Sequence, residues 1–245
     1  MAYKCYKGST LIKKLYIGST RIKKVYKGST LVWRDEPYDP NTVVYESSTG
    51  GASRTLNLEA GLYRVILVGA GGGGCGLGTK YTAGTGNIYK GTAASGGSGS
   101  GLNCIFNLST GSYAVVVGSG GSAKTASNVG GGTSQIKYAG NGGNSKFGTT
   151  IAYGGGGGYG DFLSAVGGSA GSAPTITYTR TSTSLNTAGN SGTGTTDKNT
   201  SVSGGASVYS SKGKGGNAKS GNGSTAGTAS NGGAGYVKVI YIGQP

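Results

Sequence analysis

Residues 63–74 read YRVILVGAGGGG, a conventional β-strand followed at once by a run of glycine. The chain has 55 glycines in 245 residues, and further runs lie at 154–158 (GGGGG) and 232–235 (GGAG). Glycine loses more backbone freedom on folding than any other residue, so scattered runs of this kind would indicate disorder. Here the runs alternate with short strands, which predicts a packed core in which nothing larger than glycine fits.

Other glycine-rich classes fit the composition less well. Collagen needs a strict Gly-X-Y period with abundant proline, but glycines 154–158 are consecutive and the chain has 4 prolines. Disordered chains usually carry much charge, whereas 12% of residues here are charged. Silk-like and cell-wall glycine-rich proteins stay open on composition alone.

The expected fold is all-β with packed polyglycine-II helices, which are of the polyproline II type. No stretch repeats its apolar residues with a period of 3.6, so almost no α-helix is expected. TLNL (55–58) is expected to pair with LYRVILV (62–68), and LNCIFNL (102–108) with SYAVVV (112–117). Polyproline II segments have no internal hydrogen bonds, so their buried amides need partners in neighbouring segments. Glycine helices can provide these partners, because without Cβ atoms they approach one another closely enough to form hydrogen bonds.

A ten-residue repeat opens the chain: YKGSTLIKKL (6–15), YIGSTRIKKV (16–25) and YKGSTLVWRD (26–35). Short strands with turns at Gly8, Gly18 and Gly28 predict a small β-meander over residues 1–34. So few strands bury too little surface to be stable alone, so we expect self-association, for instance as a homotrimer, or docking on another protein. The residues expected to mediate this are Tyr6, Ile12, Tyr16, Ile22, Tyr26, Val32 and Trp33. Residues 35–52 are predicted to be a linker, and residues 53–245 the glycine-rich domain.

Charge and cysteine content restrict the surroundings of the protein. The formal net charge is +15, and 9 of the 22 Lys and Arg residues precede Asp35, the first acidic residue. This charge favours nucleic acid, anionic polysaccharide or phospholipid as a partner, with a solvated strand face as the plainer alternative. Cys5, Cys75 and Cys104 are too few for a disulfide framework. Buried free thiols are expected, with a Cys75–Cys104 pair in the core as the alternative. With neither a secretory signal nor a long apolar run, synthesis in a cytoplasm and no membrane insertion are expected.

Two nucleotide-like motifs and the scarcity of catalytic residue types bear on enzymatic function. Gly69, Gly71 and Gly74 satisfy GxGxxG, and residues 118–125 (GSGGSAKT) approach a P-loop, but neither is followed by a helical pattern. The chain has no histidine, and the acids of the glycine-rich domain are Glu59, Asp161 and Asp197. Asp161 and Asp197 are a conceivable glycosidase pair, but both lie in loop-like sequence without an apolar frame to raise a pKa. We therefore expect no enzyme activity, no catalytic residues, no cofactor and no metal site.

The segments between glycine runs are rich in Tyr, Ser, Thr and Asn, which provide adaptable contacts at low entropic cost. Loops on a rigid scaffold are a common place for recognition, and tyrosines beside basic residues suit sugar rings with anionic substituents. The candidate receptor-binding residues are Tyr81, Tyr89, Lys90, Tyr159, Phe162, Tyr178, Arg180, Tyr209 and Lys212. Covering the scaffold is the alternative role for each tyrosine.

Taken together, GAGGGG after a strand, YAVVVG with SGG, AYGGGGG and a final GGAGYVKV resemble the glycine-rich domain of bacteriophage tail-fibre and adhesin proteins. The repeats of the form IKKVYKGSTLVW resemble short amino-terminal modules of phage tail proteins. Resemblance to the tip adhesins of T-even-like phages implies stacked glycine helices whose distal loops touch the bacterial receptor. A related module occurs in some animal receptor ectodomains.

The resulting hypothesis is a virion protein of a tail fibre or surface appendage, made in the host cytoplasm, that binds a bacterial glycan or outer-membrane protein. Residues 1–34 would attach it to another virion protein. One alternative is a structural fibre or capsid decoration protein without a receptor. Another is nucleic-acid binding through the basic repeats, which the absence of a nucleic-acid-binding fold motif disfavours.

Overall fold

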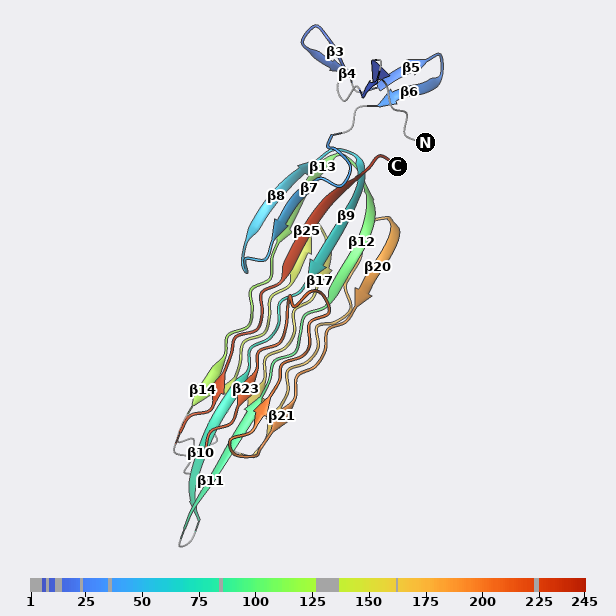
Figure 1. Ribbon diagram of the computed structural model, residues 1–245. Helices are drawn as coiled ribbons and strands as arrows, with labels where there is room; N and C mark the ends of the chain where they lie inside the picture. The colour runs from blue at the N-terminus through green and yellow to red at the C-terminus, as the bar shows by residue number, and fades with distance from the viewer. Residues whose placement is uncertain are drawn as a thin grey trace.

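The computed structural model describes residues 6–7, 9–11, 15–22, 24–34, 37–83, 86–126, 137–161, 163–222 and 225–245. Within these ranges the secondary structure is all β, with no helix, as the sequence predicts. The molecule is long and has three successive parts: a β-sandwich, a bundle of glycine-rich segments and a group of distal strands and loops (Figure 1). The chain runs back and forth along this axis, so each part is built from many separate pieces of sequence.

The sandwich consists of two antiparallel sheets. The five-stranded sheet has the order β20 (Arg180–Thr187), β12 (Gly101–Leu108), β9 (Gly61–Val68), β25 (Tyr236–Gly243) and β7 (Val43–Ser47). The four-stranded sheet has the order β17 (Thr150–Ala152), β16 (Ser145–Phe147), β13 (Gly111–Val116) and β8 (Ser53–Leu58). Side chains at alternate positions fill the space between them, including the fully buried Tyr63, Leu67, Phe106, Phe147 and Val239.

The predicted strand pairs are wrong in their partners. β8 and β9 lie in opposite sheets, as do β12 and β13, because each connection crosses from one sheet to the other. At both crossings a tyrosine hydroxyl donates a hydrogen bond to a carbonyl four residues earlier: Tyr63 to Glu59 at 2.9 Å and Tyr113 to Ser109 at 2.7 Å. These bonds fix the corner geometry, which is why the connections do not close hairpins.

The predicted linker also contains a strand. Residues 43–47 (VVYES) form β7, the edge strand that pairs with β25. The β-branched and aromatic residues of this stretch suit an edge strand, and Val44 and Tyr45 pack against the sandwich core. The sandwich therefore begins before residue 53.

Between the sandwich and the distal strands lies the glycine bundle, which we define as residues 69–74, 95–100, 117–123, 139–144, 153–158, 167–174, 188–193, 203–206, 213–217 and 230–235. These segments belong to no strand, and Figure 1 shows them as parallel wavy traces. Segment 69–74 is surrounded by others and is completely buried. Its amides donate to carbonyls of other segments in the pairs Gly69–Ser100, Gly72–Gly97, Ala70–Gly143, Gly73–Gly140, Gly71–Gly233 and Gly74–Ser230, at 2.9–3.0 Å.

The acceptor segment repeats every three residues, which is the period of a polyproline II helix. Carbonyls of the same segment accept from three further neighbours, through the amides of Gly121, Gly155 and Gly216. The segment thus has neighbours on six sides, all joined by backbone hydrogen bonds. The lateral backbone hydrogen bonds are those that the sequence predicts, and the three-residue period is consistent with the polyglycine-II helices, which stay a prediction.

Close approach explains the glycines of the bundle. A Cβ atom at Gly71 would overlap the carbonyl oxygen of Lys214, and one at Gly72 would overlap that of Gly156. Neither glycine has a positive φ, so space and not backbone conformation requires glycine at these positions. The packing also rules out phosphate binding by the nucleotide-like motif at 69–74. Its backbone amides already donate hydrogen bonds to other segments and cannot hold a phosphate.

The amino-terminal repeats form separate hairpins, and the described residues contain no ladder that would join them into one meander. The hairpin strands are β1 (Tyr6–Lys7) with β2 (Thr10–Leu11), β3 (Leu15–Ile17) with β4 (Thr20–Ile22), and β5 (Lys24–Lys27) with β6 (Thr30–Arg34). Gly18 and Gly28 have φ values of 59° and 60° at the first turn position, as a Gly-Ser hairpin turn requires. Gly8 and Ile12 lie outside the described residues.

The described hairpins expose apolar side chains. Tyr16, Ile17 and Tyr26 are exposed, and Ile22 is half-buried. For Tyr6, Val32 and Trp33 only the backbone is described, in strands β1 and β6. β3 to β6 lie beyond the sandwich, at the end opposite the distal strands (Figure 1).

Candidate functional site

The candidate site is the end of the molecule farthest from the hairpins. Five stretches, each between two bundle segments, make up the distal loops. Their described residues are 75–83 and 86–94, 124–126 and 137–138, 159–161 and 163–166, 194–202, and 218–222 and 225–229. Their strands are β10 (Cys75–Ala83), β11 (Gly86–Ala94), β14 (Lys124–Ala126), β15 (Lys137–Tyr138), β18 (Tyr159–Gly160), β19 (Ala165–Val166), β21 (Gly194–Thr195), β22 (Ser201–Val202), β23 (Ala218–Lys219) and β24 (Thr228–Ala229). The bundle therefore brings five distant stretches of sequence to one end.

The distal strands form three thin layers. The middle sheet has the order β14-β10-β11-β21, with β15-β18-β19 and β22-β23-β24 as the other two sheets. Glycine again permits the contact, since a Cβ atom at Gly91 would overlap the carbonyl oxygen of Gly221, and one at Gly160 would lie 3.2 Å from Leu77. Cys75, Leu77 and Ala94 make a small buried cluster here. The layers hold the loop ends in fixed positions without a large side-chain core.

The β10–β11 hairpin reaches farthest from the sandwich (Figure 1). Its register pairs Lys80 with Tyr89 and Tyr81 with Ile88. Only the backbone is described for Tyr81 and Tyr89, two of the predicted contact residues. Lys90 is half-buried where the hairpin leaves the layers.

An apolar strip crosses the sheet β15-β18-β19. Tyr138, Tyr159 and Val166 are neighbours across the three strands, and the rings of Tyr138 and Tyr159 lie 5.0 Å apart between centroids. Tyr138 is 67% exposed, Val166 57%, and Leu163 in the adjoining turn 64%. Exposed apolar side chains that gather in one place mark binding surfaces more often than isolated ones do.

Of this strip, Tyr159 was predicted, whereas Tyr138, Leu163 and Val166 were missed. The sequence marks these three only as apolar residues in short loops between glycine runs. That is a weak indication of binding, because apolar residues in such loops usually cover the scaffold. Phe162, another predicted contact residue, lies outside the described residues.

Asp161 fixes the turn beside the strip. Its carboxylate accepts hydrogen bonds from the Tyr159 hydroxyl, from the amides of Leu163 and Ser164, and from the Ser164 hydroxyl. Partial burial acts to raise the pKa of Asp161, but these hydrogen bonds outweigh it and hold the pKa at about 2. The same contact raises the pKa of Tyr159. Asp161 thus orders the loop, the role of an Asp in a turn, and lacks the raised pKa of a catalytic acid.

Basic side chains surround the same end. Lys90, Lys124, Lys137, Lys198 and Lys219 all belong to the distal loops, against Asp161 and Asp197 as the acidic residues. None of these lysines forms a salt bridge with another residue that the structure describes. The distal end is therefore a basic surface with an apolar strip.

The other predicted contact residues lie elsewhere. Tyr178 packs by edge contacts against Phe106, Tyr113 and Phe147 at the sandwich, which is a scaffold role. Arg180 is exposed at the start of β20 in the sandwich. The structure therefore does not bring these two to the distal end.

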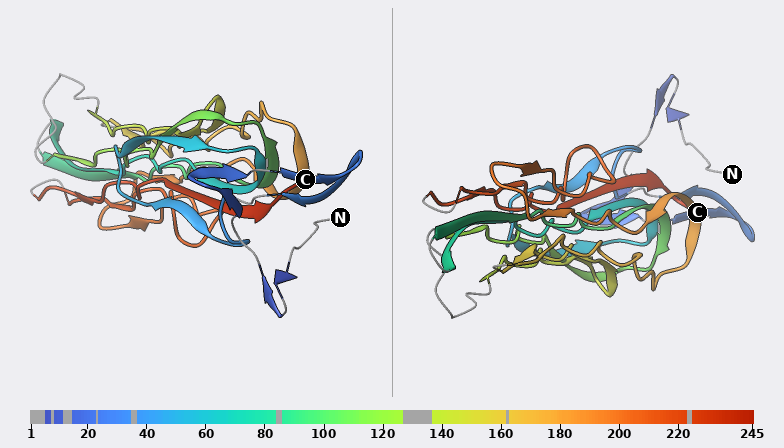
Figure 2. Two further views of the ribbon diagram at one scale, coloured as in Figure 1. Left: turned by 90° about the horizontal axis from the view of Figure 1, so that it is seen from above. Right: turned by 90° about the horizontal axis from the view of Figure 1, so that it is seen from below.

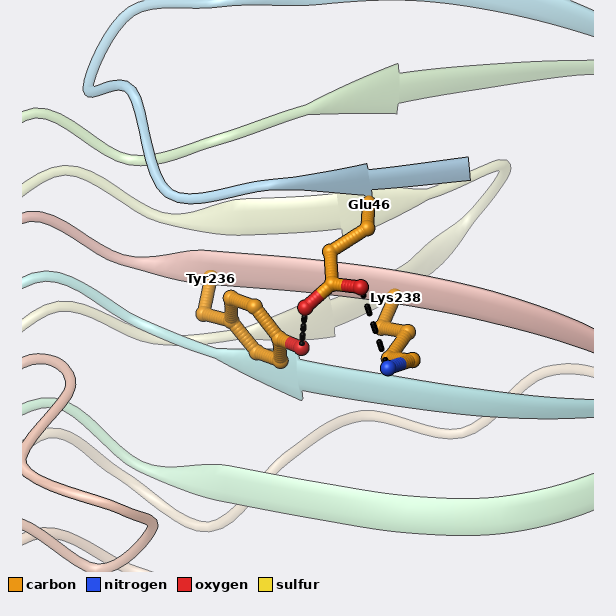
Figure 3. A network of polar contacts seen from close by, with 3 residues as sticks. All are labelled: Glu46, Tyr236 and Lys238. Atoms are coloured by element: carbon orange, nitrogen blue, oxygen red, sulfur yellow. Dashed lines mark hydrogen bonds and ion pairs between the residues drawn. The ribbon is translucent and has the colours of Figure 1, made fainter. Parts of the chain in front are cut away.

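Tyr209 and Lys212 line a second feature, the lateral cleft, whose volume is about 480 Å³. It lies beside the edge of the five-stranded sheet, where Glu46 of β7 meets β25. The Glu46 carboxylate accepts a hydrogen bond of 2.6 Å from the Tyr236 hydroxyl and forms an ion pair with the Lys238 ammonium at 3.0 Å (Figure 3). The contacts with Tyr236 and Lys238 lower the pKa of Glu46. Burial and the hydrogen bond to Glu46 together raise the pKa of Tyr236.

Nothing described here supports metal or thiol chemistry. Across the described ranges, no three His, Cys, Asp or Glu residues group as metal ligands would. Cys75 and Cys104 are free and buried, as predicted, and lie in different clusters. Burial raises the pKa of Cys75 to about 11, which keeps the thiol protonated and unreactive. Cys5 lies outside the described residues.

The sequence matches no model of a known protein family and no curated protein. In the part of the chain that the structure describes, no helix has the length and apolar character needed to span a membrane.

Proposed function

We propose that this protein is a receptor-binding protein of a bacteriophage tail fibre or adhesin, which attaches the virion to a bacterial surface glycan or outer-membrane component. One observation carries the proposal: five loops distant in sequence converge at one end of a rigid bundle, and the hairpins lie at the other. Such polarity suits a protein held at one end that makes contact at the other. The resemblance of the glycine pattern to phage tail adhesins supports the same function.

The surface of the distal loops indicates the kind of receptor. A basic end whose lysines form no salt bridge with a described residue attracts anionic groups, such as the phosphates and carboxylates of bacterial surface glycans. The apolar strip, with Tyr138 and Val166 exposed and Tyr159 half-buried between them, adds apolar contact area. Recognition by this arrangement needs no enzymatic step, cofactor or metal.

Residues 1–34 would attach the protein to another virion protein, or hold copies together, for instance as a homotrimer. The exposed Tyr16, Ile17 and Tyr26 support this role, because two-stranded hairpins gain stability when such side chains are covered. The hairpins lie at the end where such a partner would leave the distal loops free.

Reversing charge at the distal end tests the proposal. The Lys124→Glu, Lys219→Glu double variant should bind intact host cells about tenfold more weakly or worse in a cosedimentation assay, since it loses two basic contacts and adds two repulsive charges. A Lys146→Glu, Arg54→Glu variant is the matched control, as both residues are exposed on the sandwich. Equal binding by the two double variants would argue against a distal receptor site. If even the unaltered protein bound cells without saturation, the structural fibre or decoration role would replace the proposal.

A further inference from the structure

The lateral cleft is separate from the distal loops. It is lined by Glu46, Ser48, Tyr209, Ser210, Lys212 and Tyr236. The turn that carries Tyr209 and Lys212 ends at the boundary of sandwich and bundle, where Gly213 lies against Val68 and Gly69. Receptor contact at the distal end therefore leaves this cleft open to a second ligand.

Aromatic rings form one wall of the cleft. The rings of Tyr209 and Tyr236 are stacked, with centroids 6.0 Å apart and planes 20° apart, and the Lys212 ammonium lies 5.6 Å from the Tyr236 centroid. Tyr236 is buried with Ile66 and Val68 on the outer face of the five-stranded sheet, and Tyr209 packs over them half-buried. The sheet holds the wall rigid, and part of the Tyr209 side chain stays open to solvent.

Fixed polar groups face this wall. Tyr236 and Lys238 hold the two carboxylate oxygens of Glu46, and each oxygen keeps capacity to accept another hydrogen bond. Ser48 and Ser210 add hydroxyl groups, and Lys212 adds donors. Both donors and acceptors thus line one small space, and the Lys238 ion pair partly compensates the charge of Glu46.

The turn itself is strained. Ser210 and Ser211 have φ values of 42° and 61°, in the left-handed region that glycine and asparagine prefer in a two-residue turn. The Lys212 amide closes the turn on the Tyr209 carbonyl at 2.9 Å, and the Ser207 hydroxyl donates to the carbonyls of both residues. A turn that only reversed the chain would gain stability from glycine here, so the strain and its bracing indicate a role for this geometry.

We infer that the lateral cleft is a second binding site, for an uncharged saccharide. A sugar ring offers an apolar face for the Tyr209 ring and hydroxyls that both donate and accept, which matches the Glu46, Lys212 and serine groups. Among the lining residues, a free anion would face the Glu46 carboxylate and a free cation would face the Lys212 ammonium, so a neutral polyhydroxylated ligand fits best. The volume lies within the range of small-ligand sites, roughly 300–1,000 Å³.

Saturation-transfer NMR on the full chain tests this inference, with glucose, galactose, mannose, rhamnose and N-acetylglucosamine as probes. At least one sugar should show saturable transfer. Tyr209→Ala and Glu46→Gln should each weaken that binding about tenfold, through loss of ring contact and of a charged acceptor. Glu46→Gln keeps an oxygen that accepts from Tyr236, so it should stay folded, which its melting temperature checks.

The controls separate this site from the distal one. Tyr209→Phe keeps the ring and should retain most of the binding, and Lys219→Ala at the distal end should retain all of it. The inference is overturned if no sugar shows transfer, or if Tyr209→Ala and Glu46→Gln leave transfer unchanged while folded. Neither result bears on receptor binding by the distal loops, which the cosedimentation assay tests alone.

Discussion

Between β9 and segment 69–74, the chain passes from an interior filled with side chains to one that has almost none. In the sandwich, Tyr63, Leu67 and Phe106 interlock between two sheets and are fully buried. Gly73, six residues after Leu67, is also buried, yet the atoms nearest to it are backbone atoms of another segment. Figure 1 shows β9 passing directly into one of the wavy segments of the bundle, and Figure 2 gives the views of both parts from above and from below.

The difference lies in what each interior tolerates. A sandwich core is weakened chiefly when atoms are removed, because a cavity remains and apolar burial is lost. The glycine bundle is weakened when atoms are added, because a Cβ atom at most of its glycines would overlap a backbone carbonyl of a neighbouring segment. A substitution to alanine therefore removes buried atoms in the sandwich, where it replaces a large side chain, and adds an atom in the bundle, where it replaces glycine.

The largest effect is expected from adding a side chain to the centre of the bundle. Gly72→Val should abolish soluble folding, and Gly72→Ala should greatly lower the melting temperature, because the Cβ would overlap the Gly156 carbonyl oxygen. Gly86→Ala is the matched control, since no atom lies within 4 Å of its Cβ position and its φ is not positive. Soluble yield and thermal melting measure both, and soluble Gly72→Val with normal melting would refute the packing of the bundle.

Removing a side chain from the sandwich should have the next largest effect. Phe106→Ala should lower the free energy of unfolding by about 3–5 kcal/mol, from lost apolar burial and the cavity left between the sheets. The exposed Leu163→Ala should stay within about 0.5 kcal/mol of the unaltered protein in the same urea titration. Similar losses from both variants would mean that the sandwich is not a conventional apolar core.

The border between the two interiors gives an intermediate case. The buried Ser145 hydroxyl donates to the Val68 carbonyl at 2.6 Å and accepts from the Gly118 amide at 3.0 Å. Ser145→Ala leaves those groups unpaired and should cost about 1–3 kcal/mol of unfolding free energy, measured by urea denaturation. Ser112→Ala removes an exposed hydrogen bond to Asn57 and should lower the unfolding free energy clearly less. Equal losses from the two variants would mean that water reaches the polar groups around Ser145.

The smallest effect is a local response to pH. The folded pKa of Asp161 is lowered from 3.8 to about 2, so its contribution to loop stability is present above its unfolded pKa and is lost as the pH falls toward 2. The bundle segments contain no Asp or Glu and should not respond. The NMR shifts of the Leu163 and Ser164 amides should titrate with a midpoint of about 2. A midpoint near 4 would mean that the carboxylate does not hold this loop.

The bundle could be predicted because glycine leaves few options. Consecutive glycines such as those at 154–158 have no side chains to bury, so their amides must bond laterally if they fold at all. The buried free thiols of Cys75 and Cys104 and the lack of helix among the described residues followed from equally local patterns. These features depend on residue type and not on which distant segments meet.

Strand partners and the distal surface could not be predicted in the same way. NLEAGLY (57–63) and NLSTGSY (107–113) share the pattern N-L-x-x-G-x-Y, which marks the two tyrosine corners and could have shown that both connections cross between sheets. Tyr138 and Val166 meet only through three-strand pairing of short segments far apart in sequence. Tyr178 and Tyr209 share a loop-like composition with Tyr159, yet one packs on the sandwich and the other lines the lateral cleft.

Native-state hydrogen exchange of the glycine amides tests the central claim most directly, because it needs no substitution. If lateral hydrogen bonds build the bundle, the amides of Gly71, Gly72 and Gly73 should be protected to the level of global unfolding, as the core amides of β9 are. Exchange of these glycines at rates near those of an unstructured peptide, while β9 stays protected, would contradict the account.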